Sequence, residues 1–218
     1  MAERSLKNLV RFGFPGELHG VSRSRKDVAG VPCVENISQL PFGIDTAVIS
    51  VPREGIEGAV QACVDRGIKA AVIYAAGFAE EGDEGKANQA RIAQIAQSNG
   101  MALAGPNCAG VINYVDGIPL SFGPLEPERM KGRPAVALIS QSGAMMANSM
   151  ISLHARGLAV SYAISTGNEG NVTIVDYMDA LARDPSLLAF TPSAFFQRAG
   201  VTVLVGMDMP ASTPRTSP

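Results

Sequence analysis

The sequence predicts an α/β protein built on parallel β-sheets. Two observations support this fold class. Short runs of β-forming residues alternate with longer runs whose apolar residues recur at helical spacing, first over residues 45–106 and again over 135–184. The strand runs are also apolar without interruption, which is typical of strands in a parallel sheet covered by helices on both faces. The chain has 218 residues, 46% of them hydrophobic and 17% charged, as is ordinary for a globular protein with a sizeable core.

The first series predicts βαβ units. We expect strands at 45–52, 68–77 and 101–106 and helices at 54–67 and 85–100. In the first helix, Ile56, Val60 and Cys63 recur at the spacing of one helical face. The second helix ends in Asn-Gly, a usual signal for a helix C-terminus.

The second series repeats the pattern after a break. Residues 116–134 carry four prolines and show no periodicity, so we expect a linker between a first domain at 1–115 and a second domain at 135–206. The second domain starts with a strand at 135–143, a helix to residue 156, a strand at 158–166 and a helix at 172–184. Residues 201–206 have the composition of a strand, and the Pro/Ser/Thr-rich tail at 207–218 is expected to be disordered.

Composition excludes several classes of function. The net charge of −2 gives no basic surface for nucleic acid or for an anionic membrane. Cys33, Cys63 and Cys108 have no paired spacing, and with only two histidines the chain is expected to hold no metal and no disulfide framework. No apolar run reaches the roughly 20 residues that a membrane helix needs, and no secretory signal is visible, so we expect a cytoplasmic protein.

The segment GPNCAGVI at 105–112 directly follows a predicted strand. Glycine and proline turn the chain at the carboxyl edge of the sheet, where open α/β sheets bind ligands. Asn107 can donate and accept hydrogen bonds, and Cys108 is a small, soft side chain. The alternative interpretation is a turn with a structural asparagine and a buried cysteine.

The segment SQSGAMMA at 140–147 joins a predicted strand to a predicted helix. Backbone N–H groups at the helix start, together with the hydroxyl of Ser142, would form an anion site. The alternative is a serine that caps the helix without a ligand. A serine nucleophile elbow is excluded, because that motif requires Gly-x-Ser-x-Gly and the flanking glycines are absent.

Two further loops follow predicted strands. Residues 75–85 open a small-residue turn that would let a flat ligand approach the backbone. Its acidic run would repel phosphates, so we expect that run to cap the following helix or to be solvated. Residues 20–30 carry Arg23, Arg25 and Lys26, placed to meet a ribose phosphate at the end of an early strand at 16–21. A solvated basic loop explains the same residues equally well. His19 and His154 lack the setting of a catalytic histidine.

Taken in order, the segments IDTAVISVP, GIKAAVIYAAGFAEEG, GPNCAGVIN, ALISQSGAM and STGNEGNVTIVDYMDALARDP resemble the NDP-forming acyl-CoA synthetases. This family includes ADP-forming acetyl-CoA synthetase, the alpha subunit of succinyl-CoA synthetase and feruloyl-CoA-type ligases. The resemblance implies a Rossmann-like CoA-binding domain followed by a partial flavodoxin-like domain. It also implies a ligase that joins a carboxylic acid to CoA through a phosphorylated histidine, using ATP or GTP and Mg²⁺ held by an ATP-grasp domain or subunit that is absent from this chain.

Site residues are likewise implied by the resemblance. The loop containing Val21, Ser22, Arg23 and Arg25 would meet the adenosine end of CoA, with Arg25 near the 3′-phosphate. The CoA groove would be lined by Val51, Pro52, Tyr74, Ala75 and Ala76. Asn107 and Cys108 would lie near the thiol of CoA, and Gln141, Ser142 and Gly143 would cradle the phosphoryl group.

Two elements that the resemblance implies do not occur in the sequence. A glycine-rich loop of the Gly-Ala-Ser type should precede the first helix, but 1–14 lacks it, and 5–14 resembles that helix instead. The phosphate-carrying motif, His-Thr-Gly-Ala or His-Ala-Gly-Ala, is also absent, and the sequence departs from the family after Pro185. We therefore expect a chain truncated at both ends and not competent alone. The alternatives are a non-catalytic CoA-binding module and a non-functional remnant with an opened core.

Overall fold

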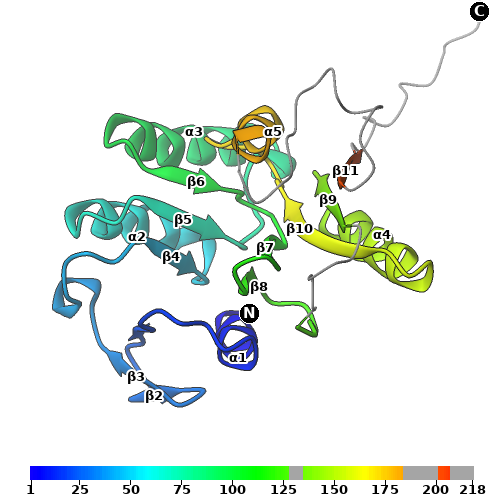
Figure 1. The fold of residues 1–218 in the computed structure, drawn as a ribbon. Helices are drawn as coiled ribbons and strands as arrows, with labels where there is room; N and C mark the ends of the chain where they lie inside the picture. The colour runs from blue at the N-terminus through cyan, green and yellow to red at the C-terminus, as the bar shows by residue number, and fades with distance from the viewer. Residues whose placement is uncertain (128–134, 184–200, 207–218) are drawn as a thin grey trace, which may run out of the picture.

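A computed structural model describes residues 1–127 and 135–183 and the backbone of 201–206. The strands form three sheets, and the helices pack between and around them (Figure 1). The predicted α/β architecture is confirmed. The expected disorder of the tail at 207–218 lies outside the described residues.

The first sheet is parallel and consists of β4 (Thr46–Ile49), β5 (Ala70–Ile73) and β6 (Ala102–Ala104), in that order. The connecting helices α2 (Arg53–Asp65) and α3 (Asp83–Ser98) pack on one face, where their apolar residues form a continuous core with the strands. Ile56, Val60 and Cys63, predicted to share a helix face, are all buried in this core. Short 3₁₀ helices, Ile37–Gln39 and Ala79–Glu81, precede β4 and α3.

The opposite face of this sheet packs against Leu120, Phe122 and Tyr177, and α1 (Ala2–Arg11) packs on the strand at 118–121. The predicted first helix is therefore confirmed, and polar residues attach it. The Ser5 and Tyr74 hydroxyls lie 2.7 Å apart, and Asn8 donates hydrogen bonds to the carbonyls of Ser121 and Gly123. Both Ser5 and Asn8 are buried, so each needs these partners.

The second sheet has the order β11-β9-β10-β7-β8. Its parallel part contains β9 (Ala135–Ser140), β10 (Ala159–Ser165) and β11 (Val201–Gly206), the last confirming the strand predicted there. Helix α4 (Gly143–Ala155) packs on one face with Leu138 and Val160, and α5 (Ile174–Arg183) packs on the other with Ile139 and Tyr162. The layers are those of a helix–sheet–helix sandwich (Figure 1).

An antiparallel hairpin extends this sheet. Strands β7 (Gly110–Asn113) and β8 (Ile118–Ser121) pair with each other, and β7 pairs with β10. The expectation of a linker without regular structure is therefore wrong for 118–121, while the division of the chain into domains at 116–134 stays a prediction. Pro119 is tolerated because β8 is the outer strand, so a residue without an N–H does not interrupt the sheet.

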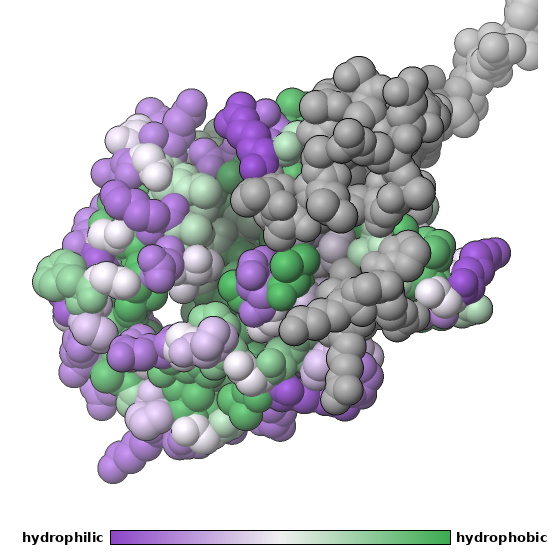
Figure 2. Space-filling model, viewed as in Figure 1, coloured by the Kyte–Doolittle hydropathy of each residue, from purple (hydrophilic) through white to green (hydrophobic). Residues whose placement is uncertain are grey.

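A third, small sheet has the order β1-β3-β2, formed by β1 (Gly20–Val21), β2 (Asp27–Val28) and β3 (Val31–Val34). The strand expected at 16–21 is thus confined to its last two residues. Among the described strands, β1 pairs only with β3, and β4 pairs only with β5. Both have one open edge, and Figure 2 shows a gap in the surface on the lower left, below β4.

The far edge of the first sheet, at β6, is covered by a loop from the second half of the chain. The N–H of Leu103 donates to Oδ1 of Asn171, at 2.9 Å, and the N–H of Val172 donates to the carbonyl of Leu103, at 3.2 Å. These two hydrogen bonds therefore join the edge strand β6 to the loop between β10 and α5. In the part of the chain that the structure describes, no helix has both the length and the apolar character to span a membrane.

Candidate functional site

The turn after β6 begins the site. The Gly105–Pro106 bond is cis, and Asn107 adopts a left-handed conformation with φ of 56°. The N–H of Asn107 donates to the carbonyl of Ala75 at 2.8 Å, which fixes the turn against the end of β5. The side chain of Asn107 is exposed, whereas Cys108 is buried. The strand-end turn predicted from the sequence is confirmed.

Cys108 is held as a neutral thiol. Its Sγ donates to the carbonyl of Ile73, and its burial raises its pKa to about 11. Only the thiolate is a strong nucleophile, so this cysteine has the character of a packing residue. The alternative interpretation from the sequence, a turn with a buried cysteine, accounts for Cys108.

The start of α4 lies directly against this turn. A Cβ atom on Gly143 would lie 2.5 Å from the Cβ of Ala109, so the close approach requires glycine. Ser142 caps the helix, since its hydroxyl accepts a hydrogen bond from the N–H of Met145 at 3.3 Å. Ser165, at the end of β10, joins both segments: its hydroxyl accepts from the N–H of Ala109 and donates to the carbonyl of Gln141.

A third segment, the loop at residues 166–171, meets the turn at Asn107 and the segment before α4. Asn168 donates to Gln89 Oε1 at 3.0 Å and also to a carboxylate oxygen of Glu80, and its Oδ1 accepts from the side chain of Asn107. Burial alone would raise the pKa of Glu80, but the hydrogen bonds from Asn168 and from the N–H of Gly77 outweigh it, and the pKa is lowered. The acidic run that we expected to cap a helix or to be solvated therefore supplies one member of this network.

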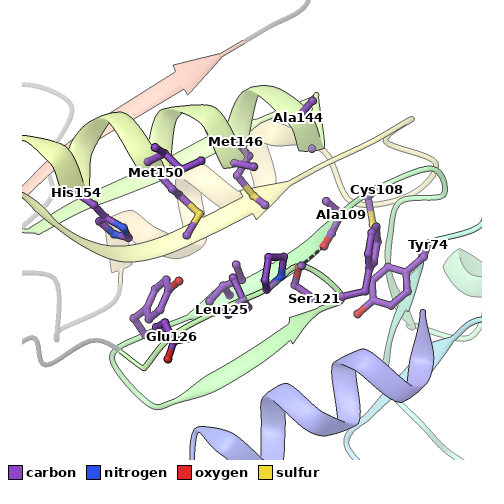
Figure 3. A pocket seen from close by; sticks show the side chains of 18 of the residues that line it. Tyr74, Cys108, Ala109, Ser121, Leu125, Glu126, Ala144, Met146, Met150 and His154 are labelled. Atoms are coloured by element: carbon purple, nitrogen blue, oxygen red, sulfur yellow. Dashed lines mark hydrogen bonds between the residues drawn. The ribbon is translucent and has the colours of Figure 1, made fainter.

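A pocket of about 650 Å³ opens beside the place where these three segments meet. It lies between α4 and the segment that runs from β7 and β8 to Glu126. Figure 3 shows Met146, Met150 and His154 pointing from α4 toward Leu125 and Glu126, with Cys108 and Tyr74 at the other end. No sequence signal located this pocket, because it is formed by segments far apart in the chain.

The predicted groove residues lie at the carboxyl ends of two adjacent parallel strands. Val51 and Pro52 follow β4, and Tyr74, Ala75 and Ala76 follow β5, which brings them to the edge that also carries Asn107. Val51, Pro52 and Ala76 are exposed there, and Ala75 is buried. The side chain of Tyr74 points to the other face, where it packs edge-on against Phe122 and lines the pocket.

The basic loop after β1 lies apart from these segments in the hydrogen-bond network. Arg25 pairs with Glu3 at 2.9 Å, and its N–H donates to the hydroxyl of Ser22. Val21 and Arg23 are exposed. Among the described hydrogen bonds and ion pairs, none joins 21–25 to the ends of β4, β5 or β6. The structure therefore unites the predicted residues of the turn, the α4 start and the two strand ends, and it does not join the basic loop to them.

Two family models match the chain in succession. The model described as "CoA binding domain" matches residues 1–114, and the one described as "Succinyl-CoA ligase like flavodoxin domain" matches residues 133–191. The chain belongs to the CoA-binding domain family. Its second part is a succinyl-CoA ligase-like flavodoxin domain, and the Rossmann-like and flavodoxin-like order expected from the sequence is confirmed.

Known relatives are acyl-CoA synthetases. The chain is 42% identical over 180 residues to a trans-feruloyl-CoA synthase from an unknown prokaryotic organism, with 82% of this chain and 26% of that protein covered. It is 33% identical over 181 residues to the ADP-forming acetate–CoA ligase I of Archaeoglobus fulgidus, with 83% and 26% covered. The chain thus spans about a quarter of the length of these relatives.

A solved structure shares the fold. The apo form of the dinucleotide-forming acetyl-coenzyme A synthetase 1 of Ca. Korarchaeum cryptofilum superposes with a TM-score of 0.78 at 27% identity, covering 93% of this chain and 46% of that one. A second structure of that protein, in complex with phosphate and ADP, matches equally well.

One charged residue of this CoA-binding domain was missed by the sequence analysis. Arg53 begins α2, directly after Pro52, and donates to the carbonyl of Gly77 at 3.2 Å. It also contacts Glu81 and Glu54. A cation in the first turn of a helix is electrostatically unfavourable, because the N-terminal end of the helix dipole is positive. An arginine directly before the predicted helix was therefore the sequence signal that could have singled out Arg53. Within the residues that the structure describes, no group of three or more His, Cys, Asp or Glu side chains is arranged to hold a metal ion.

Proposed function

We propose that the chain is the CoA-binding portion of an NDP-forming acyl-CoA synthetase, which joins a carboxylic acid to CoA with ATP or GTP through a phosphohistidine. The supporting observation is the meeting of the two segments that carried the resemblance. The turn at Asn107 and Cys108 abuts the start of α4 at Gly143, and a family model matches on each side of that contact. The proposal includes a cytoplasmic setting.

CoA fits the residues at this edge. The exposed strand-end surface carries no bulky side chain at Val51, Pro52 and Ala76. It therefore has room for the extended arm of CoA. Helix α2 starts directly after β4 at this edge, and no side chain caps its N-terminus. Arg25 is exposed, and a phosphate would replace the carboxylate of Glu3 as its partner.

The start of α4 is the proposed phosphoryl cradle. Ser142 already caps the helix, so the donors that remain are backbone N–H groups of Gly143 and Ala144, which have no partner among the described hydrogen bonds. Gln141 is exposed beside them. The histidine that would carry the phosphate, and the nucleotide with its Mg²⁺, would come from an ATP-grasp domain or subunit and from sequence that this chain does not contain.

The test is a comparison of CoA with dephospho-CoA by titration calorimetry on the purified chain. In Arg25→Gln, affinity for CoA should fall about tenfold while affinity for dephospho-CoA stays unchanged, because only CoA carries the 3′-phosphate. The control is Arg183→Gln, which removes an exposed arginine that also pairs with a carboxylate, that of Asp179. Absence of CoA binding in the unmodified chain would refute the proposal.

A second measurement separates the alternatives. The chain is incubated with γ-labelled ATP and assayed for acid-labile phosphate. CoA binding without labelling supports a binding portion that depends on a partner, or a non-catalytic module. The addition of an ATP-grasp subunit together with a segment that carries the phosphohistidine distinguishes these two, since only the former then forms acyl-CoA. Neither binding nor labelling identifies a non-functional remnant.

A further inference from the structure

The side chain of Asn107 lies at one end of a series of hydrogen-bonded amides, Gln89–Asn168–Asn107. Asn107 donates from Nδ2 to Oδ1 of Asn168 at 3.3 Å. Asn168 in turn donates from Nδ2 to Oε1 of Gln89 at 3.0 Å and to the carboxylate of Glu80. A carboxamide has one donating end and one accepting end, so each member of this amide series decides which end of the next member it meets. The direction of the whole series therefore depends on the members that are fixed by other groups.

Gln89 is fixed by two backbone groups. Its Oε1 lies 3.2 Å from the backbone nitrogen of Ala79, whose N–H can only donate. Its Nε2 lies 3.4 Å from the carbonyl oxygen of Asn168, which can only accept. Reversal of this amide would place two donors together and two acceptors together. Gln89 therefore presents an oxygen, and not its NH₂ group, to the side chain of Asn168.

Glu80 fixes Asn168 in the same sense. One carboxylate oxygen of Glu80 accepts from the N–H of Gly77 at 2.7 Å, and the other faces the side chain of Asn168. An ionised carboxylate can only accept hydrogen bonds. Asn168 therefore meets both Glu80 and Gln89 with its NH₂ group. This leaves Oδ1 of Asn168 as the atom that faces Asn107.

The orientation of Asn107 follows from that of Asn168. Its Nδ2 must face Oδ1 of Asn168, so its own Oδ1 is the atom that stays available for a ligand. Asn107 is exposed, and none of the described hydrogen bonds reaches its Oδ1. The backbone holds the two residues together, because the N–H of Asn168 donates to the carbonyl of Pro106 at 2.9 Å. The turn after β6 thus offers a hydrogen-bond acceptor at the strand-end edge.

We propose that Asn168 and Gln89 are positioning residues, which hold Asn107 with its amide oxygen available to the ligand. The inference rests on the proposed function for the identity of that ligand, since Asn107 then lies near the thiol end of CoA. That end of CoA carries two hydrogen-bond donors, the S–H group and the N–H of the nearest amide. An oxygen acceptor held in place recognises such a donor, whereas an amide that is free to turn presents its NH₂ group part of the time.

The test is Gln89→Met, a change to a side chain of similar shape that accepts hydrogen bonds only weakly. It leaves Asn107 and every residue proposed to touch CoA in place. Three ligands are titrated into the full chain by calorimetry: CoA, desulfo-CoA, whose thiol is replaced by hydrogen, and adenosine 3′-phosphate 5′-diphosphate, the nucleotide half of CoA without its arm. Gln89→Met should lower the affinity for CoA about fivefold and leave the affinity for the nucleotide half unchanged.

Desulfo-CoA separates the two donors. If the thiol is the donor, desulfo-CoA binds equally well to the unmodified chain and to Gln89→Met. If the amide N–H is the donor, desulfo-CoA loses as much affinity as CoA does. Either result supports the inference, because only ligands that carry the arm are affected. An equal loss for all three ligands would overturn it, since a merely structural effect does not distinguish the arm from the nucleotide, and an unchanged affinity for CoA would overturn it as well.

Two further variants complete the set. Gln89→Glu keeps an oxygen acceptor for Asn168, so it should restore most of the affinity for CoA that Gln89→Met loses. A loss as large as in Gln89→Met would contradict the inferred orientation. The matched control is Gln94→Met, the same change at an exposed position of α3, which should bind all three ligands as the unmodified chain does. Melting temperatures should confirm that the variants are folded.

A measurement without ligand separates this inference from the proposed function. Heteronuclear NMR follows the side-chain amide protons of Asn168 and Asn107, which shift when their hydrogen bonds are lost. Both sets of resonances should shift in Gln89→Met and stay in place in Gln94→Met. Unchanged Asn168 resonances in Gln89→Met would overturn the inference even in a chain that binds CoA. Shifted resonances in a chain that binds no CoA would refute the proposed function alone.

Discussion

Replacement of Gly167 by alanine tests the contact between the two halves at the site. Gly167 has φ of 61°, and a Cβ there would lie 2.4 Å from the carbonyl oxygen of Pro106 and 2.7 Å from that of Asn107. Gly100 provides a matched control, because its φ of 63° is nearly the same and a Cβ there would have no atom within 4 Å. The pair separates the cost of the left-handed backbone from the cost of the contact.

The two costs differ in size. An alanine in the left-handed region loses about 1 kcal/mol, and Gly100→Ala should lose that amount. Gly167→Ala loses the same and must also displace two backbone oxygens, which costs a further ~1–3 kcal/mol by analogy with overpacked cores. We therefore expect Gly167→Ala to be less stable than Gly100→Ala by about 2 kcal/mol, a difference of about 4–8 °C in melting temperature for a chain of this size.

The assay is urea unfolding followed by circular dichroism, with thermal melts as a second measure. The m-value should be unchanged in both variants, so that the midpoints report stability alone. Equal losses in the two variants would show that the loop at 166–171 moves away from the turn without cost, and the description of the two segments as tightly fitted would be wrong.

Two further outcomes follow from the titrating groups. Hydrogen bonds from Arg25 and Lys7 lower the pKa of Glu3 from 4.5 to about 2, so the stability from these pairs is present above pH 4.5 and is lost as the pH falls toward 2. The melting-temperature advantage of the unmodified chain over Glu3→Gln should therefore shrink across that range, and an advantage that grew on acidification would contradict it. Burial raises the pKa of Cys63 and Cys108 to about 11, so iodoacetamide at pH 8 should label the half-buried Cys33 first and the other two only after unfolding, as read by mass spectrometry. Faster labelling of Cys108 in the native protein would contradict the packing described for it.

Local periodicity predicted the elements of both halves that are regular and buried. The helix at 54–67 was visible because Ile56, Val60 and Cys63 recur at its spacing, and α2 buries all three. The β7–β8 hairpin was missed because Pro119 signals a break, whereas an outer strand accepts a residue without an N–H. The helix at the start of the chain buries Ser5 and Asn8, so its attachment depends on polar contacts that hydrophobic patterning does not register.

The site was predictable in part. Asn107 and Gly143 were singled out because each follows a strand, and strand ends of parallel sheets meet at one edge. The network of Asn168, Gln89 and Glu80 could not be predicted, since it joins the loop at 166–171 to α3 and to the 3₁₀ helix Ala79–Glu81, and their proximity depends on how the two sheets pack. The pocket has the same origin, because α4 and the segment ending at Glu126 become neighbours only in the folded chain.

The loop at 171–172 that covers β6 has a consequence for how the molecule can be divided. A boundary between the two family models falls after residue 114, but the strand edge at Leu103 obtains its hydrogen-bond partners from beyond that boundary. The first half prepared by itself would present that row of backbone groups to solvent and to other copies of itself. Because the two halves share these hydrogen bonds, mutations that loosen one should lower the stability of the other.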